Sequence, residues 1–187
     1  MPSSIQVLPG FYQWLFVYFE PISAMIAAPM IWIYPGTTWF HHEQIPGVNL
    51  PGMASSVSSE VLDPRTVVAL WQLGNCYMLV GFIVSLVFRV TGDAFHDNPN
   101  AQERIVGAIL CALAITDVTH VLSSFIGLPP DIRYNPALWN GITHGNITLT
   151  TFLFCARLAW FMGVGRSRFH SGSQRSRESV RSGQKAQ

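Results

Sequence analysis

The chain has 187 residues, of which 49% are hydrophobic and 11% are charged, with a formal net charge of +1. Because soluble domains usually carry roughly 25% charged residues, this composition argues against a soluble globular domain and favours an integral membrane protein. Six of the eleven Lys and Arg residues follow Gly165, and no basic groove with interleaved aromatic residues is present, which argues against a nucleic-acid partner.

Four apolar segments set the predicted architecture. At ~1.5 Å per residue, roughly 20 apolar residues cross a hydrocarbon core of about 30 Å. We therefore predict an all-α fold, a four-helix transmembrane bundle over residues 1–165, followed by a disordered basic tail rich in Ser and Arg over residues 166–187. The expected helices cover residues 11–34, 67–88, 105–126 and 142–162.

A long polar loop is expected between the first two helices, over residues 35–66. It contains His41, His42 and Glu43, which offer metal-ligand side chains or, as the favoured interpretation, an interfacial polar cluster after two aromatic residues. We predict no metal site and no cofactor. A second loop, over residues 127–140, contains three prolines and is expected to be non-helical for most of its length.

Charge distribution predicts the orientation of the chain. Four crossings place both termini on one side, together with Arg89, Arg104 and the six basic residues of the tail, while Arg65 and Arg133 lie on the other side. Because cytoplasmic loops carry an excess of Lys and Arg, both termini are expected to be cytoplasmic. The expected location is the endoplasmic reticulum, as a multi-pass membrane protein.

The third segment carries the clearest candidate site. Asp117 and His120 lie three residues apart, on one face of the helix. An aspartate near the centre of a membrane helix costs roughly 2.5 to 3.5 kcal/mol on insertion scales. An ionisable pair at this depth is therefore a candidate functional site.

Polar residues of the other segments are expected to join this pair. Counting ~1.5 Å per residue from the lumenal helix ends puts Asp117 at about 13 Å and Arg157 at about 22 Å, with Glu20 level with Arg157. We predict a Glu20–Arg157 ion pair between the first and fourth helices and a separate polar layer nearer the lumenal side. The predicted layer contains Asp117, His120, Gln72, Asn75 and Asn146, with His144 close to the membrane interface.

The chemistry expected of this layer is proton donation. In a medium of low dielectric the charged carboxylate is disfavoured, so Asp117 is expected to act as a general acid, with His120 as the partner base and Glu20 as a second acid. The amides and His144 would bind the substrate or orient water, with Arg157 beside them. The alternative is structural: Asp117 and His120 bond to an asparagine and fix helix register, and Glu20–Arg157 is a structural ion pair.

Five sequence blocks resemble a fungal family of small four-helix membrane proteins of unknown function. The likeness covers about residues 8–165, and the blocks occur in order along the chain. They are FEPISA, WQLGNCYMLVGF, AITDVTHV, WN followed by HGN, and ARLAWFMGVG. The resemblance implies a four-helix membrane fold, and at the level of class it is similar to membrane enzymes of fungal secondary metabolism.

The expected function combines these observations. It is a membrane enzyme, an epoxide hydrolase or an epoxide-opening cyclase, that acts on a lipophilic polyketide or terpenoid by carboxylic-acid protonation. The expected partners are this lipophilic substrate, membrane lipid and, as a possibility, further copies of the chain. The alternative is a non-catalytic membrane protein that binds a sterol or lipid, or that scaffolds pathway enzymes.

Overall fold

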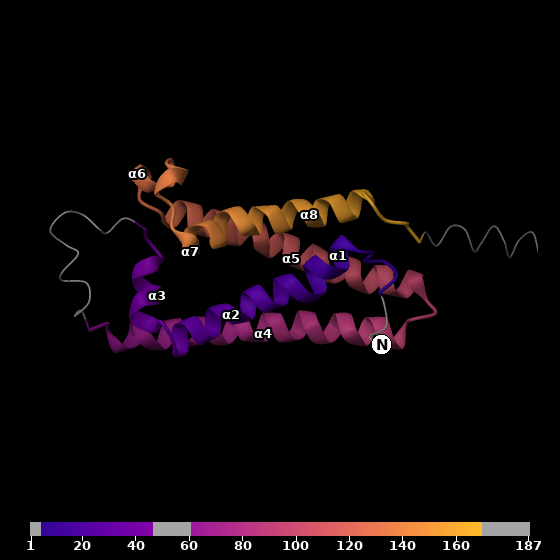
Figure 1. Cartoon of the computed structure of the whole chain (residues 1–187), viewed down its shortest axis with the longest axis horizontal. Helices are drawn as coiled ribbons and strands as arrows, with labels where there is room; N and C mark the ends of the chain where they lie inside the picture. Colours follow the sequence, from indigo (N-terminus) through magenta and orange to yellow (C-terminus); the bar gives the residue numbers. More distant parts are fainter. Residues whose placement is uncertain (1–4, 47–60, 170–187) are drawn as a thin grey trace, which may run out of the picture.

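The computed structural model describes residues 5–46 and 61–169, and within them every regular element is helical (Figure 1). The first helical segment is continuous from α1 (Phe11–Gln13) through a π-helical stretch (Trp14–Phe19) to α2 (Glu20–Trp32), and α3 (Thr37–Glu43) follows it. Two long helices come next, and a last segment follows two short turns. These elements are α4 (Pro64–Ala94), α5 (Pro99–Gly127), α6 (Pro130–Arg133), a 3-10 turn (Pro136–Leu138), α7 (Gly141–His144), a second π-helical stretch (Gly145–Leu149) and α8 (Thr150–Met162).

The helix boundaries follow from capping residues. Asp63 accepts a hydrogen bond from the backbone N–H of Arg65 at 2.8 Å, and Asn98 accepts one from Ala101 at 3.0 Å. Both caps are followed directly by a proline, which fits the first position of a helix because its missing N–H would have no partner there. At the other end of the chain, α8 stops at Gly163, whose positive φ of 80° suits a left-handed helix cap.

Three helices are long and apolar enough to cross a membrane, by length and composition. They cover Phe11–Trp32, Pro64–Ala94 and Pro99–Gly127. The fourth predicted segment, residues 142–162, is helical throughout but is not among them. His144, Asn146 and Arg157 lie inside it and lower its hydropathy. The predicted basic tail lies almost wholly beyond the described residues.

The helices form two pairs (Figure 1). α2 packs along α4, and α5 packs along α8. The first pair is close because α4 presents glycines to α2: a Cβ on Gly74 would stand 2.8 Å from Nε1 of Trp32, and one on Gly81 would stand 3.0 Å from the carbonyl oxygen of Pro21. The indole of Trp32 also donates to the carbonyl of Trp71, at 3.2 Å.

The two pairs meet at one end of the molecule and separate at the other. We call the end with the α4–α5 connection the closed end and the end with α3 and α6 the open end (Figure 1). A hydrophobic core fills the closed end, where Phe16, Phe88, Leu110 and Trp160 are fully or almost fully buried.

The segment before α1 completes this core. Val7 and Leu8 are fully buried, and the carbonyl of Val7 accepts a hydrogen bond of 2.9 Å from the Trp160 indole. The backbone N–H of Gln6 donates to the side chain of Gln102, at 3.0 Å. The closed end is therefore tightly packed, and the space between the two helix pairs lies toward the open end.

Candidate functional site

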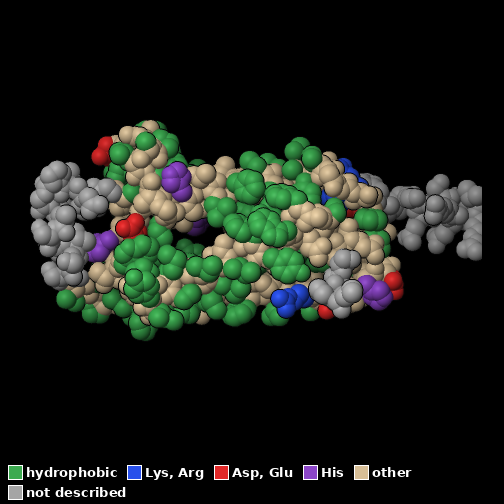
Figure 2. Space-filling view, viewed as in Figure 1, with side chains coloured by type: hydrophobic (Ala, Val, Ile, Leu, Met, Phe, Trp, Pro, Cys, Tyr) green, Lys and Arg blue, Asp and Glu red, His purple; other side chains and the backbone are tan. Residues whose placement is uncertain are grey.

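A cavity of about 550 Å³ lies between the two helix pairs toward the open end. Figure 2 shows the molecule hollowed at this place, with hydrophobic side chains around the opening. Its walls come from α2, α3, α4, α5 and the segment from α7 to α8. Polar or ionisable side chains on this wall are Glu20, Ser23, Glu43, Tyr77, Thr116, Asp117, His120, Asn146 and Thr150.

Two carboxylates and one guanidinium meet at the inner end of the cavity. Arg157 is completely buried and donates through Nη1 to Oδ2 of Asp117, at 2.5 Å, and through Nη2 to Oε1 of Glu20. The guanidinium carbon also lies 5.5 Å from the centre of the Phe16 ring. Glu20 and Asp117 line the cavity, whereas Arg157 lies behind them. The three residues come from the first, third and fourth predicted helices, and we call them the triad.

The predicted Glu20–Arg157 ion pair is confirmed, but the separation of Asp117 from it is wrong. The depth estimate counted backbone positions only. Side chains on a helix lean toward its N-terminus, and α5 and α8 run in opposite directions. The side chains of Asp117 and Arg157 therefore lean toward each other, which closes a difference of about 9 Å between their backbone levels.

The triad leaves hydrogen-bonding capacity unused. Oε2 of Glu20 and Nε of Arg157 are both buried and have no hydrogen-bond partner among the described residues. Buried polar groups are bonded in the great majority of cases, so each exception calls for a reason. π-helical stretches also border the site, since one ends directly before Glu20 and the other contains Asn146. Such insertions are frequent at functional sites.

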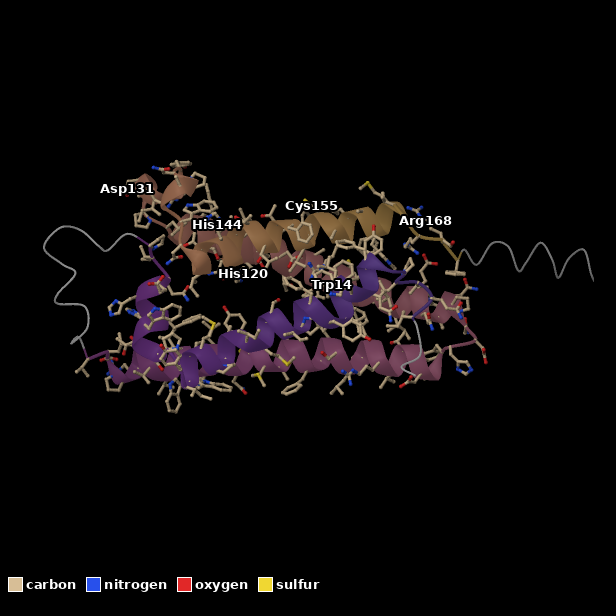
Figure 3. The ribbon with its side chains drawn as sticks, viewed as in Figure 1. Trp14, His120, Asp131, His144, Cys155 and Arg168 are labelled. Carbon is tan, nitrogen blue, oxygen red and sulfur yellow. The ribbon has the colours of Figure 1, made fainter. Side chains whose placement is uncertain are left out.

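A second cavity of about 370 Å³ adjoins the first. Tyr77, His120 and Asn146 line both cavities. The wall of the second is more polar and includes Gln44, Ser123, Ser124 and Thr143. His120 makes no hydrogen bond with another described residue, so both of its ring nitrogens are available to a ligand or to water. Figure 3 shows His120 beside the space between the helix pairs. Because the two residues are three positions apart on α5, His120 lies on the same face of the helix as Asp117.

Two predicted substrate-binding residues do not reach the cavity. Gln72 and Asn75 are exposed on α4, on the side of that helix that faces away from α2. The second helix instead contributes Tyr77 to the site. The sequence of a helix that is apolar on most sides does not show which face points inward. The prediction took the amides to mark that face, whereas the glycines mark the face that packs against α2.

The remaining predicted residues divide between the wall and the exterior. His144 is exposed, bonds through Nδ1 to the Thr148 hydroxyl at 3.0 Å and lines neither cavity (Figure 3). Asn146 lines both cavities, as predicted for a substrate-binding residue. Arg157 contacts the two acids instead of the cavity, so its place in the predicted substrate-binding set is corrected to that of a residue that holds Glu20 and Asp117.

Glu43 is a cavity residue that sequence reasoning did not assign to the site. Its carboxylate accepts a 2.6 Å hydrogen bond from the amide of Asn140, which lies 97 residues away, and this contact joins α3 to the start of α7 near the cavity. The adjacent histidines, His41 and His42, pack their rings edge to face at 5.3 Å. Within residues 5–46 and 61–169, no group of three or more metal-ligand side chains is placed to hold a metal ion.

Comparison with known proteins identifies the family of the chain. Searches of curated proteins and of solved structures gave no match. The model of a protein family does match, and it covers residues 5–167 of the 187, including the three residues of the triad and the walls of both cavities. The chain therefore belongs to the family described as a domain of unknown function, DUF7704.

Proposed function

We propose that this protein is a membrane enzyme that opens an epoxide on a lipophilic polyketide or terpenoid, in fungal secondary metabolite biosynthesis. The observation that supports the proposal is the triad: two carboxyl groups at the inner end of a cavity with apolar walls, which share one buried guanidinium. A substrate dissolved in the bilayer fits such a cavity, and its epoxide oxygen is the atom that the acid would protonate.

The net charge of the triad supports protonation of one of its two carboxyl groups. If Glu20 and Asp117 were both ionised, the triad would carry a net charge of −1, and an uncompensated buried charge is very costly. One proton on either carboxyl group makes the triad neutral. Oδ1 of Asp117 is a suitable place for this proton, because Asp117 lines the cavity and the other oxygen of the same carboxyl group already bonds to Arg157. The triad thus holds one carboxylic acid that can act as a general acid.

The second cavity favours hydrolysis over cyclisation. Its polar wall suits water, and His120 stands between it and the substrate cavity. In the proposed reaction the carboxyl proton passes to the epoxide oxygen as a C–O bond breaks. A water oxygen forms a bond to that carbon, and His120 takes the proton that the water releases. Transfer of this proton to the carboxylate restores the triad.

We also propose a membrane topology, from the packing of the last helical segment and the positions of the arginines. Residues 141–162 are proposed as a fourth crossing, because this segment packs along α5 and buries its one charged residue, Arg157, in the triad. Arg89, Arg104, Arg166 and Arg168 belong to the closed end, which is then cytoplasmic together with both termini. The open end and both loops then face the lumen of the endoplasmic reticulum.

The test compares wild-type protein with Glu20→Gln and Asp117→Asn in microsomes supplied with a lipophilic epoxide. Each variant replaces one carboxyl group and leaves a neutral pair with Arg157, so both are expected to fold. We expect turnover to fall by about 10²- to 10⁴-fold, the usual contribution of general acid catalysis. Cys111→Ser, an exposed position on the same helix as Asp117, is the matched control. Equal turnover by all four proteins would refute acid catalysis by the triad.

The alternative is a non-catalytic protein that binds a sterol or lipid, or that scaffolds pathway enzymes. The observation that favours it is that both acids already contact Arg157, as they would in a purely structural cluster. In that case Asp117→Asn leaves the amount of pathway product unchanged. A bulky substitution in the cavity wall, such as Ala27→Trp, would reduce sterol binding and would not change the turnover of an epoxide.

A further inference from the structure

The outer face of α4 carries two amides without partners. Gln72 and Asn75 are exposed, and neither makes a hydrogen bond with a described residue. Exposed hydroxyl groups on α5 behave differently: Thr116 and Thr119 donate to carbonyls of their own helix, at 2.9 and 3.0 Å. Gln72 and Asn75 belong to the helix Pro64–Ala94, which is long and apolar enough to cross a membrane. In the proposed topology they lie about 7 and 12 Å from the lumenal end of the predicted segment 67–88, and in the hydrocarbon core water is not available to replace a protein partner.

These amides belong to a regular stripe of exposed residues. Its spacings alternate between four and three residues, which is the a/d pattern of a helix that packs along another helix. The four apolar members are 50% to 60% exposed. We call this stripe the α4 seam, and it consists of Val68, Gln72, Asn75, Leu79, Phe82 and Leu86. The face that packs on α2, with Gly74 and Gly81, lies on another side of the helix.

We propose that the α4 seam binds the α4 seam of a second copy of this chain, as a parallel pair of helices at the centre of a homodimer. An amide has both a donor and an acceptor, so two identical side chains can satisfy each other. A two-fold axis along the membrane normal brings each seam residue opposite its own equivalent, at the same depth. Asn75 then meets Asn75 of the partner subunit, and a single polar pair of this kind also fixes the register of two helices.

The dimer is independent of the proposed enzymatic activity. The seam is on the side of α4 away from the cavity, and none of its six residues lines either cavity. A failure of the epoxide assay therefore leaves this proposal untouched, and the absence of a dimer leaves the triad and the cavities as described.

Disulfide trapping in native membranes tests the seam directly. In a full-length chain with Cys76, Cys111 and Cys155 changed to serine, we expect Leu79→Cys to form a disulfide-linked homodimer on mild oxidation. Ile115→Cys is the matched control, because Ile115 is 62% exposed on α5, outside the seam, against 55% for Leu79. Equal cross-linking at both positions, no cross-link at Leu79→Cys, or a cross-link to a different protein would overturn the proposal.

Sedimentation in density-matched detergent provides a measurement that keeps the native cysteines. The wild-type chain is expected to sediment as a dimer, and Asn75→Leu to weaken the association by about tenfold, the scale of one or two hydrogen bonds within a membrane. Thr119→Val, on α5, is expected to leave the dimer intact. A monomeric wild-type chain, or equal association of wild type and Asn75→Leu, would overturn the role of the seam.

Discussion

Removal of Arg157 is the most informative perturbation of the triad. Arg157→Met keeps most of the volume of the side chain but leaves Glu20 and Asp117 without their shared cation. With one proton on the pair, one buried negative charge remains uncompensated, and loss of one partner from a buried ion pair costs about 3 to 5 kcal/mol. We expect a loss of this size in the free energy of unfolding, measured by SDS titration of the purified protein in mixed micelles.

Compensating substitutions distinguish the contribution of charge to the stability of the triad from the contribution of packing. The triple variant Glu20→Gln, Asp117→Asn, Arg157→Met contains no buried charge in the triad, and neutral replacement of a buried ion cluster often has little net cost. We therefore expect the triple variant to recover most of the lost stability. The double variant Glu20→Gln, Asp117→Asn leaves Arg157 alone and should be as unstable as Arg157→Met. If Arg157→Met lost less than about 1 kcal/mol, or if the triple variant were no better than Arg157→Met, the charge account of the triad would be wrong.

Two further predictions concern packing and the closed end. Gly81→Ala places a Cβ against the side chain of Met25 and 3.0 Å from the carbonyl oxygen of Pro21, and it should cost about 1 to 3 kcal/mol of stability. Gly107→Ala, whose nearest neighbour would be at 3.6 Å, should be nearly neutral. Equal effects in the same SDS titration would contradict the close α2–α4 contact. Trp160→Phe removes the 2.9 Å hydrogen bond to Val7 and leaves a buried carbonyl unpaired. We therefore expect the free energy of unfolding to fall by about 1 to 3 kcal/mol and amide hydrogen exchange to become faster in the segment before α1. Unchanged exchange there would count against the role of this bond.

Sequence patterns predicted the helices and the first ion pair. Long apolar runs marked the helices, and equal backbone depth was enough to pair Glu20 with Arg157. The caps at Asp63 and Asn98 were not used, and α4 and α5 begin at Pro64 and Pro99, before the predicted ranges 67–88 and 105–126. The direction in which a side chain leans lay outside that depth estimate. For this reason Asp117 was assigned to the wrong layer.

The inward face of α4 and the contacts of the loops were beyond sequence reasoning. α4 is apolar around most of its circumference, so periodicity could neither exclude Asn75 from the cavity nor assign Tyr77 to it. The bond between Glu43 and Asn140 joins positions 97 residues apart and depends on how two loops fold over the open end. Composition contains no information about such a contact.

The segment before α1 has a consequence for the order of assembly. The hydrogen-bond partner of Gln6 lies 96 residues further along the chain, and the partner of Val7 lies 153 residues further along. At a translation rate of roughly 5 to 20 residues per second, the ribosome needs about 8 to 30 s to make the second partner. The segment before α1 can therefore complete its contacts only after α5 and α8 have been synthesised, so its docking is a late step of biogenesis.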